Sequence, residues 1–460
     1  MKIGLLPLYI ELYDKATPGL RPRLEGFYNE IKKEFEERGV EVTTSDFCRL
    51  KPEFDKTIKE FEKAEVDAIV TLHMAYSPSL ESIEALAKTD LAVVVLDTTD
   101  TLEFTPMQDP GDVSYCHGVH GVMDMCSMLT RYDKPYAIAA GHYKESDCID
   151  RCVGFVKSAM AAKCIKNANV ALIGGAFEGM GDFSVSAAEL KDTFGITIND
   201  ADPNELLKIS ESITDDEIKK EMEENAKRFP ISENTVEEDY KNSVRACLSV
   251  RRYIEEKKLT AFSVNFLKMG GGAGISSMPF VECCKAMERG IGYAGEGDGL
   301  TAAFTGAFMQ GYPKTNFVEI FCPDWKNNTV FLSHMGEVNY RIADTVPTIE
   351  PTRGNLTGGS WPYVGYTRMM GGKGVYVNIS RGKDDYQLLI APSEMKSVKE
   401  DNFPKHMRGW MEPETVSTAE FLEQLSIHGA THHSCFIYDA TVEEMEFFAK
   451  LISVRSVVIK

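Results

Sequence analysis

Apolar residues in the first third of the chain alternate between short continuous runs and helical spacing. The runs at 66–73 and 91–98 (LAVVVLDT) are typical of strands that a parallel sheet buries on both faces. Between such runs apolar residues recur every three or four positions, as they do from Leu24 to Phe35 ahead of Gly39. This alternation of strand and helix predicts an open, doubly wound α/β domain, which we place at residues 1–165.

The same alternation returns near residue 169 and ends near Pro313. VALIGG (170–175) predicts a strand that runs into glycine, and residues 203–258 predict solvated, charged helices. A second α/β domain is therefore expected at 166–312. Beyond it, short strands such as NTVFLSHM, GVYVNIS, YQLLIAP and HSCFIYDA are separated by turns rich in Gly, Pro and Asn. Residues 313–460 accordingly predict an antiparallel β-rich domain or small barrel.

Composition narrows the class of protein. The 460 residues carry a formal net charge of -20, and such an acidic surface repels nucleic acid and anionic membranes, so neither is an expected partner. Glu11 and Asp14 interrupt the N-terminal apolar run, which fits a first strand better than a signal peptide. The 11 cysteines form no CxxC pair. We expect buried free thiols and a cytoplasmic location.

Two carboxylates stand in sequence contexts that suggest chemistry. Glu296 lies in GYAGEGDGLTAA, where the flanking glycines let the backbone turn tightly and leave the carboxylate projecting into a cleft. Glu319 lies among apolar neighbours in TNFVEIFCPDW, where a carboxylate is costly unless it is paired or bound to a metal. Each also fits a structural role, as a turn acid or as a solvent-facing strand position.

Three histidines add imidazole groups to this set. His334 ends an apolar strand in VFLSHMGEV, and the pair His432 and His433 precedes another strand in HGATHHSCFIY. Neighbouring residues of an extended segment point to opposite faces, so one of the pair is expected to reach a given metal. Two carboxylates and two imidazoles suit Mn²⁺, Co²⁺ or Mg²⁺, and the ligand types do not exclude Zn²⁺.

Segments along almost the whole chain resemble the L-arabinose isomerase family, which is related in fold to L-fucose isomerase. In order they are IGLLPLY, LHMAYSPSLESIEALAKTDLAVVVLDT, CHGVHGVMDMCSML, AIAAGHY, AFSVNF, GYAGEGDGLTAA, FVEIF, LSHMGEV and HGATHHSCF. The GEGD, SHMxEV and HH segments are the most specific. The resemblance implies two Rossmann-like domains followed by a β-barrel, and trimers or hexamers with active sites between subunits.

The resemblance also assigns roles to residues. It places the metal ligands on Glu296, Glu319, His334 and His433, with Mn²⁺ as the expected ion and Co²⁺ or Mg²⁺ as alternatives. The implied reaction is an aldose–ketose isomerisation of an open-chain sugar through an enediol, in which Glu296 and Glu319 share the acid–base work. The implied substrate-binding positions are Leu8, Tyr9, His117, Met180, Phe266 and His432.

Among these positions, His117 is the one expected to come from a neighbouring subunit. The family sends a histidine from a neighbouring subunit into the active site, and the CHG segment places that role on His117. His120, one helical turn further on, is the alternative. The site is therefore expected to need a homotrimer or homohexamer.

The chain departs from the family pattern around the sugar. Leu6 stands where the family has a glutamine that touches the sugar, and Gly181 stands where an arginine follows the methionine. Gly299 replaces the aromatic residue after GEGD, and Ile320 replaces an aspartate. The ligand set is thus retained while the residues around the substrate are changed.

The identity of the sugar therefore stays open between L-arabinose, L-fucose, D-galactose and a deoxy, acidic or sulfonated hexose. An anionic sugar would need a cation, and four basic residues lie near loop glycines: Lys268, Lys314, Arg353 and Arg368.

Two other classes of function compete with an isomerase. Two Rossmann-like domains also resemble sugar-binding proteins, although that function gives Glu296, Glu319, His334 and His433 no role. The glycine-rich segments GGAFEGMG (174–181) and GGGAG (270–274) suggest a nucleotide-binding enzyme, but neither matches GxGxxG or the P-loop pattern.

Overall fold

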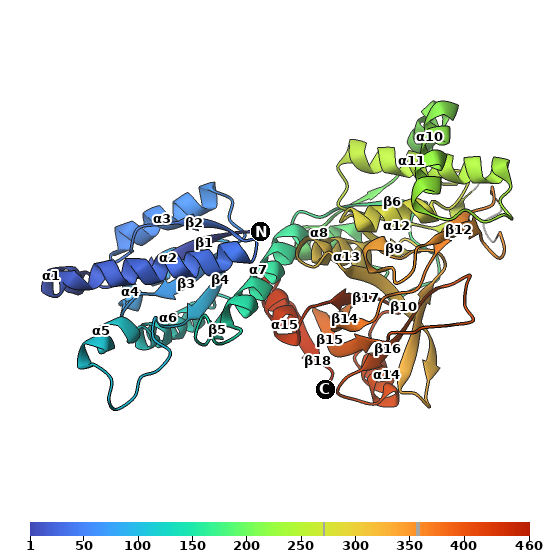
Figure 1. Ribbon diagram of the computed structural model, residues 1–460. Coiled ribbons are helices and arrows are strands. Elements are labelled where there is room, and N and C mark those ends of the chain that lie inside the picture. Colours follow the sequence, from blue (N-terminus) through green and yellow to red (C-terminus); the bar gives the residue numbers. More distant parts are fainter. Residues whose placement is uncertain (270–271, 356–358) are drawn as a thin grey trace. The chain divides into compact units, whose positions relative to one another are not determined.

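The computed structural model describes residues 1–269, 272–355 and 359–460, which form two compact units (Figure 1). Unit 1 is Met1–Lys163 and unit 2 is Cys164–Lys460. Part of the GGGAG segment, residues 270 and 271, lies outside the described residues.

Unit 1 is a doubly wound α/β domain, as the spacing of apolar residues predicts. Its sheet has the order β2-β1-β3-β4-β5 and all pairings are parallel. The strands are β1 (Lys2–Leu8), β2 (Glu41–Thr44), β3 (Ala68–His73), β4 (Ala92–Asp97) and β5 (Tyr136–Ala140). The helices are α1 (Glu11–Ala16), α2 (Arg21–Glu37), α3 (Lys51–Lys63), α4 (Ser79–Lys88), α5 (Val113–Cys116), α6 (Val119–Arg131) and α7 (Cys148–Ile165), which ends just beyond the unit.

The core of unit 1 contains one histidine that has no polar contact. His73 ends β3 and is 5 % exposed, and in the described part of the chain neither of its ring nitrogens has a hydrogen-bond partner. Gly118 and Gly121 let the start of α6 approach it closely, since a Cβ at either would lie 2.7 Å from a His73 atom. Burial lowers the pKa of His73 to about 3, so the imidazole is neutral in the folded protein.

Unit 2 begins with a second parallel sheet, in the order β7-β6-β8-β9. Its strands are β6 (Asn169–Ile173), β7 (Thr197–Asp200), β8 (Ala261–Val264) and β9 (Gly292–Gly295). The helices are α8 (Ala187–Phe194), α9 (Pro203–Ser212), α10 (Asp215–Arg228), α11 (Glu237–Lys257), α12 (Phe280–Glu288) and α13 (Gly299–Gly311). Helices lie on both faces of the sheet (Figure 1).

The rest of unit 2 is a closed antiparallel barrel. Six strands follow the order β14-β17-β10-β11-β16-β15, and the pairing of β14 with β15 closes the ring. They are β10 (Thr315–Asp324), β11 (Thr329–His334), β14 (Gly372–Arg381), β15 (Tyr386–Met395), β16 (Met407–Pro413) and β17 (His433–Tyr438). Further elements are the hairpin β12 (Thr348–Pro351) and β13 (Tyr363–Tyr366), the helices α14 (Thr418–Ile427) and α15 (Val442–Leu451), and β18 (Arg455–Val458), which pairs with β15 in parallel. The predicted fold class is confirmed.

Helix α13 joins the sheet to the barrel. It is buried along nearly its whole length and contacts β6, β8 and β9 on one side and β10, β14 and β17 on the other. Small residues make this possible: a Cβ on Gly292 would lie 2.2 Å from the carbonyl oxygen of Ala302. Because sheet and barrel share α13 within one compact unit, the division into domains at residue 312 stays a prediction.

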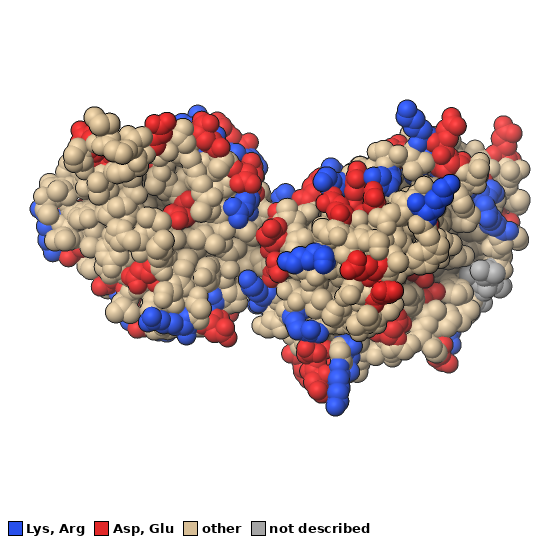
Figure 2. Space-filling model, turned by 90° about the horizontal axis from the view of Figure 1, so that it is seen from below, with Lys and Arg blue, Asp and Glu red and all other residues tan. Residues whose placement is uncertain are grey.

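The surface charge is mixed. On the face shown in Figure 2, Lys and Arg side chains lie scattered among Asp and Glu side chains. No helix among the described residues has the length and apolar character needed to cross a membrane. All the cysteines are free thiols, and most are at least partly buried; Cys322, which we expected in the interior, is exposed.

The buried His73 predicts that unit 1 loses stability in mild acid. The unfolded chain binds a proton near the ordinary histidine pKa of 6.5, whereas folded His73 does not until about pH 3. Its contribution is therefore fully present above pH 6.5 and is lost as the pH falls below that value, by up to about 1.4 kcal/mol per pH unit. Hydrogen exchange of the amides of β3, corrected for intrinsic rates, measures this opening free energy.

The control for this experiment removes the titrating group. His73→Leu should flatten the dependence of β3 protection on pH between about 7 and 5, and His142→Leu, at a partly exposed histidine of the same unit, should not. An equal slope in His73→Leu and the unchanged protein would show that His73 does not carry the effect.

Candidate active site

The four predicted metal ligands converge in unit 2 from the sheet and the barrel. Glu296 follows β9, Glu319 lies on β10, His334 ends β11 and His433 begins β17. The Nε2 atom of His433 lies 3.6 Å from Glu296 Oε2, and the Nε2 atom of His334 lies 3.9 Å from Glu319 Oε2. Donor atoms of Glu319, His334 and His433 all lie within 4.8 Å of one another, as do those of Glu296, His432 and His433.

Strand register places Glu319 and His433 side by side. Glu319 is directly opposite His433 on β17. On β11 its partner is Ser333, and His334 reaches the site from the next position, the last of that strand. Cross-strand neighbours on one face of a sheet have Cβ atoms about 5 Å apart, which brings their side chains into contact. The side chain of Glu319 is only 24 % exposed, so its alternative role as a solvent-facing strand residue does not apply.

The turn that carries Glu296 explains the glycines around it. Glu296 adopts a left-handed backbone with φ of 64°, and Gly297 follows with φ of 83°. A Cβ at Gly297 would lie 2.4 Å from the Cα of Ala176, so only glycine fits. The Oγ atom of Ser263 accepts a hydrogen bond of 2.8 Å from the Gly297 amide and fixes the turn.

His334 and His433 are each held through Nδ1 by a buried carboxylate. His334 Nδ1 lies 2.6 Å from Glu337 Oε2, and His433 Nδ1 lies 3.0 Å from Asp298 Oδ2. Tyr293 donates a hydrogen bond of 2.8 Å to the other oxygen of Glu337. This pairing turns both Nε2 atoms towards the glutamates, and it is the arrangement that metal-binding histidines adopt. His433 Nε2 is buried and has no hydrogen-bond partner in the described residues.

Sequence reasoning missed these anchoring carboxylates. Asp298 belongs to the GEGD segment and Glu337 to SHMGEV, so each lies two or three residues beyond a predicted ligand. For Glu337 the signal was a carboxylate three residues after a predicted histidine ligand, because metal-bound histidines commonly donate their second nitrogen to a carboxylate. Asp298 holds a histidine that is 135 residues away, so no local spacing indicates that contact.

One expectation about the histidine pair is wrong. His432 and His433 do not point apart: their ring centroids are 4.2 Å apart, and both Nε2 atoms lie 3.6 Å from Glu296 Oε2. The reason is that β17 begins at His433, so His432 lies in a bend outside the strand. Asp182 holds it there, 2.6 Å from Nδ1 and 2.9 Å from the backbone nitrogen.

The carboxylates and imidazoles shift one another's protonation. Burial raises the pKa of Glu319. Burial acts in the same direction on Glu296, but the close contact with His432 and the charges of the other imidazoles outweigh burial and lower the pKa of Glu296. The Glu296 contact, assisted by Asp182 against the effect of burial, raises the pKa of His432 to about 9. Burial opposes the charged form of His334, yet Glu337 raises its pKa.

Aromatic side chains shield the histidines from solvent. The ring of Phe317 meets those of His334 and His433 edge-on, with centroids 4.9 Å apart in both cases. Phe183 stacks on His433 at 5.1 Å. Such walls limit access of water and strengthen electrostatic interactions among the enclosed groups.

A cavity of about 520 Å³ opens beside these groups. Glu296, His334 and Glu337 line it, together with the predicted substrate residue Phe266. Its other side chains are mostly apolar or aromatic, with a few basic ones: Val264, Met278, Phe280, Tyr293, Phe321, Met335, Thr352, Arg353, Pro362, Tyr366, Lys405 and His406. The volume is in the range of small-molecule sites.

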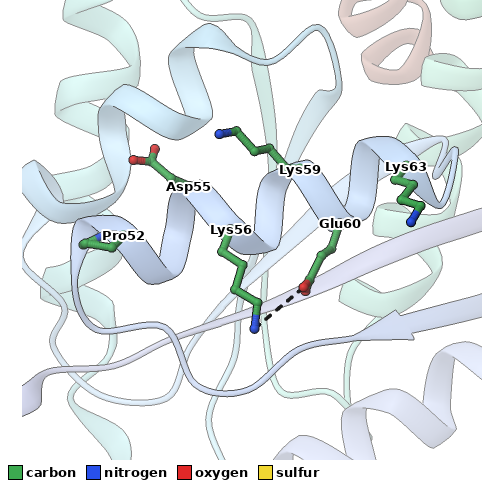
Figure 3. A pocket seen from close by; sticks show the side chains of 6 residues that line it. All are labelled: Pro52, Asp55, Lys56, Lys59, Glu60 and Lys63. Atoms are coloured by element: carbon green, nitrogen blue, oxygen red, sulfur yellow. Dashed lines mark ion pairs between the residues drawn. The ribbon is translucent and has the colours of Figure 1, made fainter.

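A second hollow lies on unit 1 and has a different character (Figure 3). It is lined by one outer face of α3, by the residues Pro52, Asp55, Lys56, Lys59, Glu60 and Lys63. Lys56 and Glu60 form an ion pair of 3.7 Å, one helical turn apart. Charged residues of this kind are typical of the solvent-exposed face of a helix, and those that line this hollow do not form a catalytic group.

The remaining predicted substrate residues are divided between the two units. Met180 lies in the loop after β6 and is partly buried. Leu8 and Tyr9 are buried in unit 1, with 1 % and 0 % exposed. His117, also in unit 1, has Nε2 2.8 Å from the hydroxyl of Tyr13. Their substrate-binding roles stay predictions.

His117 and His120 form a small aromatic group in unit 1. Their ring centroids are 5.2 Å apart, and His120, which is exposed, stacks on Tyr76 at 4.8 Å. Burial, with a smaller effect from His120, lowers the pKa of His117. The choice between the two histidines stays open.

The packing explains two departures from the family pattern. A Cβ at Gly299 would lie 2.9 Å from Ile198 Cδ1 and 3.3 Å from Leu172 Cδ2, so the aromatic residue of the family does not fit here. Leu6 is fully buried in the hydrophobic core of unit 1, where a glutamine would need hydrogen-bond partners.

Comparison with known proteins decides the family. Residues 173–310 match the L-arabinose isomerase central domain and residues 314–455 match the L-arabinose isomerase C-terminal domain. The chain belongs to the L-arabinose isomerase family. Members of this family are aldose–ketose isomerases, and the chain is therefore a sugar isomerase.

Individual relatives are distant but extensive. The L-arabinose isomerase of Bacillus subtilis is 23 % identical over 463 residues, which cover 98 % of this chain and 90 % of the relative. That of Anoxybacillus flavithermus is 25 % identical over 357 residues, covering 74 % and 69 %. Among solved structures, an arabinose-transporter periplasmic binding protein from Shewanella is 12 % identical and covers 68 % of this chain and 84 % of its own, with a TM-score of 0.18. A score this low carries no argument.

The close packing of Gly295 against His334 yields a testable prediction. In Gly295→Ala the new Cβ would lie 2.7 Å from Cε1 and 2.9 Å from Nε2 of His334, so the imidazole or β9 must move. We expect a loss of about 1–3 kcal/mol in the free energy of unfolding. Urea denaturation followed by tryptophan fluorescence measures it, because all three tryptophans, Trp325, Trp361 and Trp410, lie in unit 2.

Gly181→Ala is the matched control, since a Cβ there meets nothing within 4 Å. Its free energy of unfolding should stay within about 0.5 kcal/mol of the unchanged protein. Equal stabilities of the two variants would contradict the close contact between Gly295 and His334.

Proposed function

We propose that this protein is a divalent-metal-dependent aldose–ketose isomerase that acts on an open-chain sugar through an enediol. The observation that carries the proposal is the convergence of two carboxylates and two carboxylate-anchored imidazoles on one centre. Its membership of the L-arabinose isomerase family supplies the reaction class.

The donor groups fit a metal ion. Glu296, Glu319, His334 and His433 would hold it, and their carboxylate oxygens and imidazole nitrogens favour Mn²⁺, with Co²⁺ or Mg²⁺ as alternatives. The unpartnered, buried Nε2 atom of His433 supports this, because such an atom is costly without a ligand. A bound ion would supply Lewis-acid stabilisation of the charge that develops on the C1 and C2 oxygens of the sugar.

The protein groups account for the proton movements. Isomerisation removes a proton from C2 of the aldose and returns one to C1, while a second proton passes between the two oxygens. We assign this work jointly to Glu296 and Glu319. His432, held by Asp182, is placed to donate a hydrogen bond to a sugar oxygen near Glu296. Phe317 and Phe183 help to keep water from the enediol.

The other predicted substrate residues extend the site. Phe266 lines the cavity, and Met180 follows the parallel strand β6. His117 belongs to unit 1, and we propose that it enters the active site of a neighbouring subunit in a homotrimer or homohexamer. Leu8 and Tyr9, which are buried in the same unit, stay predicted substrate residues. A cytoplasmic location is part of the same proposal.

Activity measurements test the metal and the two glutamates together. Treatment with a chelator should abolish ketose formation from an aldose panel, and added Mn²⁺ or Co²⁺ should restore it. Glu296→Gln and Glu319→Gln should each lower kcat by about 10²- to 10⁴-fold, because the amide cannot accept the proton. Glu412→Gln, in a surface ion pair with Lys396, should leave kcat unchanged.

Two results would contradict this proposal. Activity that survives complete removal of the metal would refute the metal dependence. A full rate in either Glu296→Gln or Glu319→Gln would refute the acid–base assignment of that residue.

Metal affinity, independent of activity, tests the anchoring carboxylates. Glu337→Gln replaces the charged partner of His334 by a neutral amide, and we expect isothermal titration with Mn²⁺ to show a dissociation constant raised about 10- to 100-fold. Tyr293→Phe removes only one hydrogen bond to Glu337 and should have a smaller effect in the same direction. Circular dichroism verifies folding, and an unchanged dissociation constant in folded Glu337→Gln would contradict the role.

A further inference from the structure

The cavity beside the metal ligands carries positive charge that isomerisation does not use. Arg353, Lys405 and His406 line the same cavity as Glu296 and His334. Proton transfer between C1 and C2 requires carboxylates and a Lewis acid, and it requires no cation from this part of the wall. We therefore expect these basic residues to contact a part of the substrate that does not take part in the proton transfer.

Of the four cations that the sequence offers for an anion, the structure brings Arg353 to the cavity. Lys314 is paired with Asp439 at 3.0 Å. Arg368 is held between Asp344 and Asp401 in ion pairs. Lys268 lies on the turn after β8 and does not line the cavity.

Arg353 and Lys405 differ in how their charges are paired. Lys405 is paired with Glu350 at 2.9 Å, and the side chain of that glutamate is 14 % exposed. Within the described residues no ion pair engages Arg353, whose side chain is exposed. The cavity carries the carboxylates of Glu296 and Glu337 as well, and these contact the histidines of the site. Arg353 is therefore the cation of the lining that is left for an anion from outside the protein.

His406 adds a hydrogen-bonding group next to Arg353. Its Nδ1 atom is buried and has no hydrogen-bond partner among the residues described. Burial, followed by the charges of Arg353 and Arg408, lowers the pKa of His406. A neutral imidazole in this position can donate one hydrogen bond to an oxygen atom.

The rest of the lining is poor in hydrogen-bonding groups. Met278, Phe280, Phe321, Met335 and Pro362 have apolar side chains. A neutral sugar in this cavity would supply no counter-charge to Arg353. An oxyanion would match the guanidinium fork with two parallel hydrogen bonds.

We propose that the substrate of this isomerase is an aldose with an anionic substituent (a carboxylate, phosphate or sulfonate) that Arg353 binds, in a cavity that Lys405 and His406 also line. This inference rests on the proposed isomerase function and concerns the substrate class of the same site. It assigns to Arg353 the recognition of the substrate's charged group. The residues that differ from the family pattern around the sugar do not identify such a group.

Binding of alditols tests the inference without turnover. An alditol lacks the carbonyl group and does not react, so isothermal titration of the Mn²⁺-loaded protein compares glucitol with its 6-phosphate, 6-sulfonate and 6-carboxylate analogues. We expect at least one charged alditol to bind about tenfold or more tightly than glucitol. The three charged arms distinguish the kinds of anion.

Variants connect the preference to the residue. Arg353→Met should remove the advantage of the charged alditol, and Arg353→Lys should retain part of it, because lysine keeps the charge and loses the fork. Lys314→Met, which removes an equal charge outside the cavity, should keep the full advantage. Equal binding of neutral and charged alditols, or an advantage that survives Arg353→Met, would overturn the inference.

Turnover separates failure of the inference from failure of the proposed function. The matched aldoses, neutral and charged, are assayed for ketose formation with Mn²⁺. A neutral aldose converted with kcat/KM equal to or above that of every charged one would overturn the inference and leave the isomerase function standing. No ketose from any aldose would overturn the proposed function and, with it, this inference. Preferred conversion of a charged aldose, lost in Arg353→Met, would support both.

Discussion

The site depends on the contact between Asp298 and His433. Both side chains are fully buried, and Asp298 uses one oxygen for His433 Nδ1 at 3.0 Å and the other to cap α13 through the amide of Thr301 at 2.9 Å. The helix cap, the turn that carries Glu296 and the first residue of β17 are thereby tied together. Because α13 also packs against both the parallel sheet and the barrel, one carboxylate sets where Glu296, which follows the sheet strand β9, meets His433 of the barrel.

The helices and strands were largely predictable from local sequence patterns, whereas the strand pairings that close the barrel were not. A strand that is buried on both faces, such as β4, is identified by a continuous apolar run. A helix that is buried along one stripe, such as α2, is identified by apolar residues at every third or fourth position. The barrel requires β10 to pair with β17, Thr315 opposite Ile437. No periodicity encodes a pairing between segments so far apart. The parallel attachment of β18 to β15 is equally invisible, since a strand pattern carries no direction.

The candidate site was predictable to a different degree. The glycines around Glu296 indicate a tight turn, because glycine adopts a left-handed backbone at little energetic cost. Glu296 and Gly297 both have a left-handed backbone in the structure. The side-by-side placement of Glu319 and His433 follows from register alone, which sequence does not give. The direction of His432 was predicted wrongly because the alternation rule was applied one residue before the strand begins. Asp298 and Glu337 were overlooked because a search for ligands does not ask what holds the ligands.

The two halves of the site place different demands on the sequence. A metal centre needs fixed donors and supporting carboxylates, and small displacements are costly there, as the packing of Gly295 on His334 indicates. A substrate wall needs only complementary shape and charge, so residues there can change while the chemistry is kept. This chain keeps every predicted ligand, fills positions such as Gly299 and Leu6 with residues suited to its own packing, and brings Arg353 to the cavity. The proposed isomerase of an anionic sugar needs this combination, because it keeps the groups that move protons and changes those that contact the substrate.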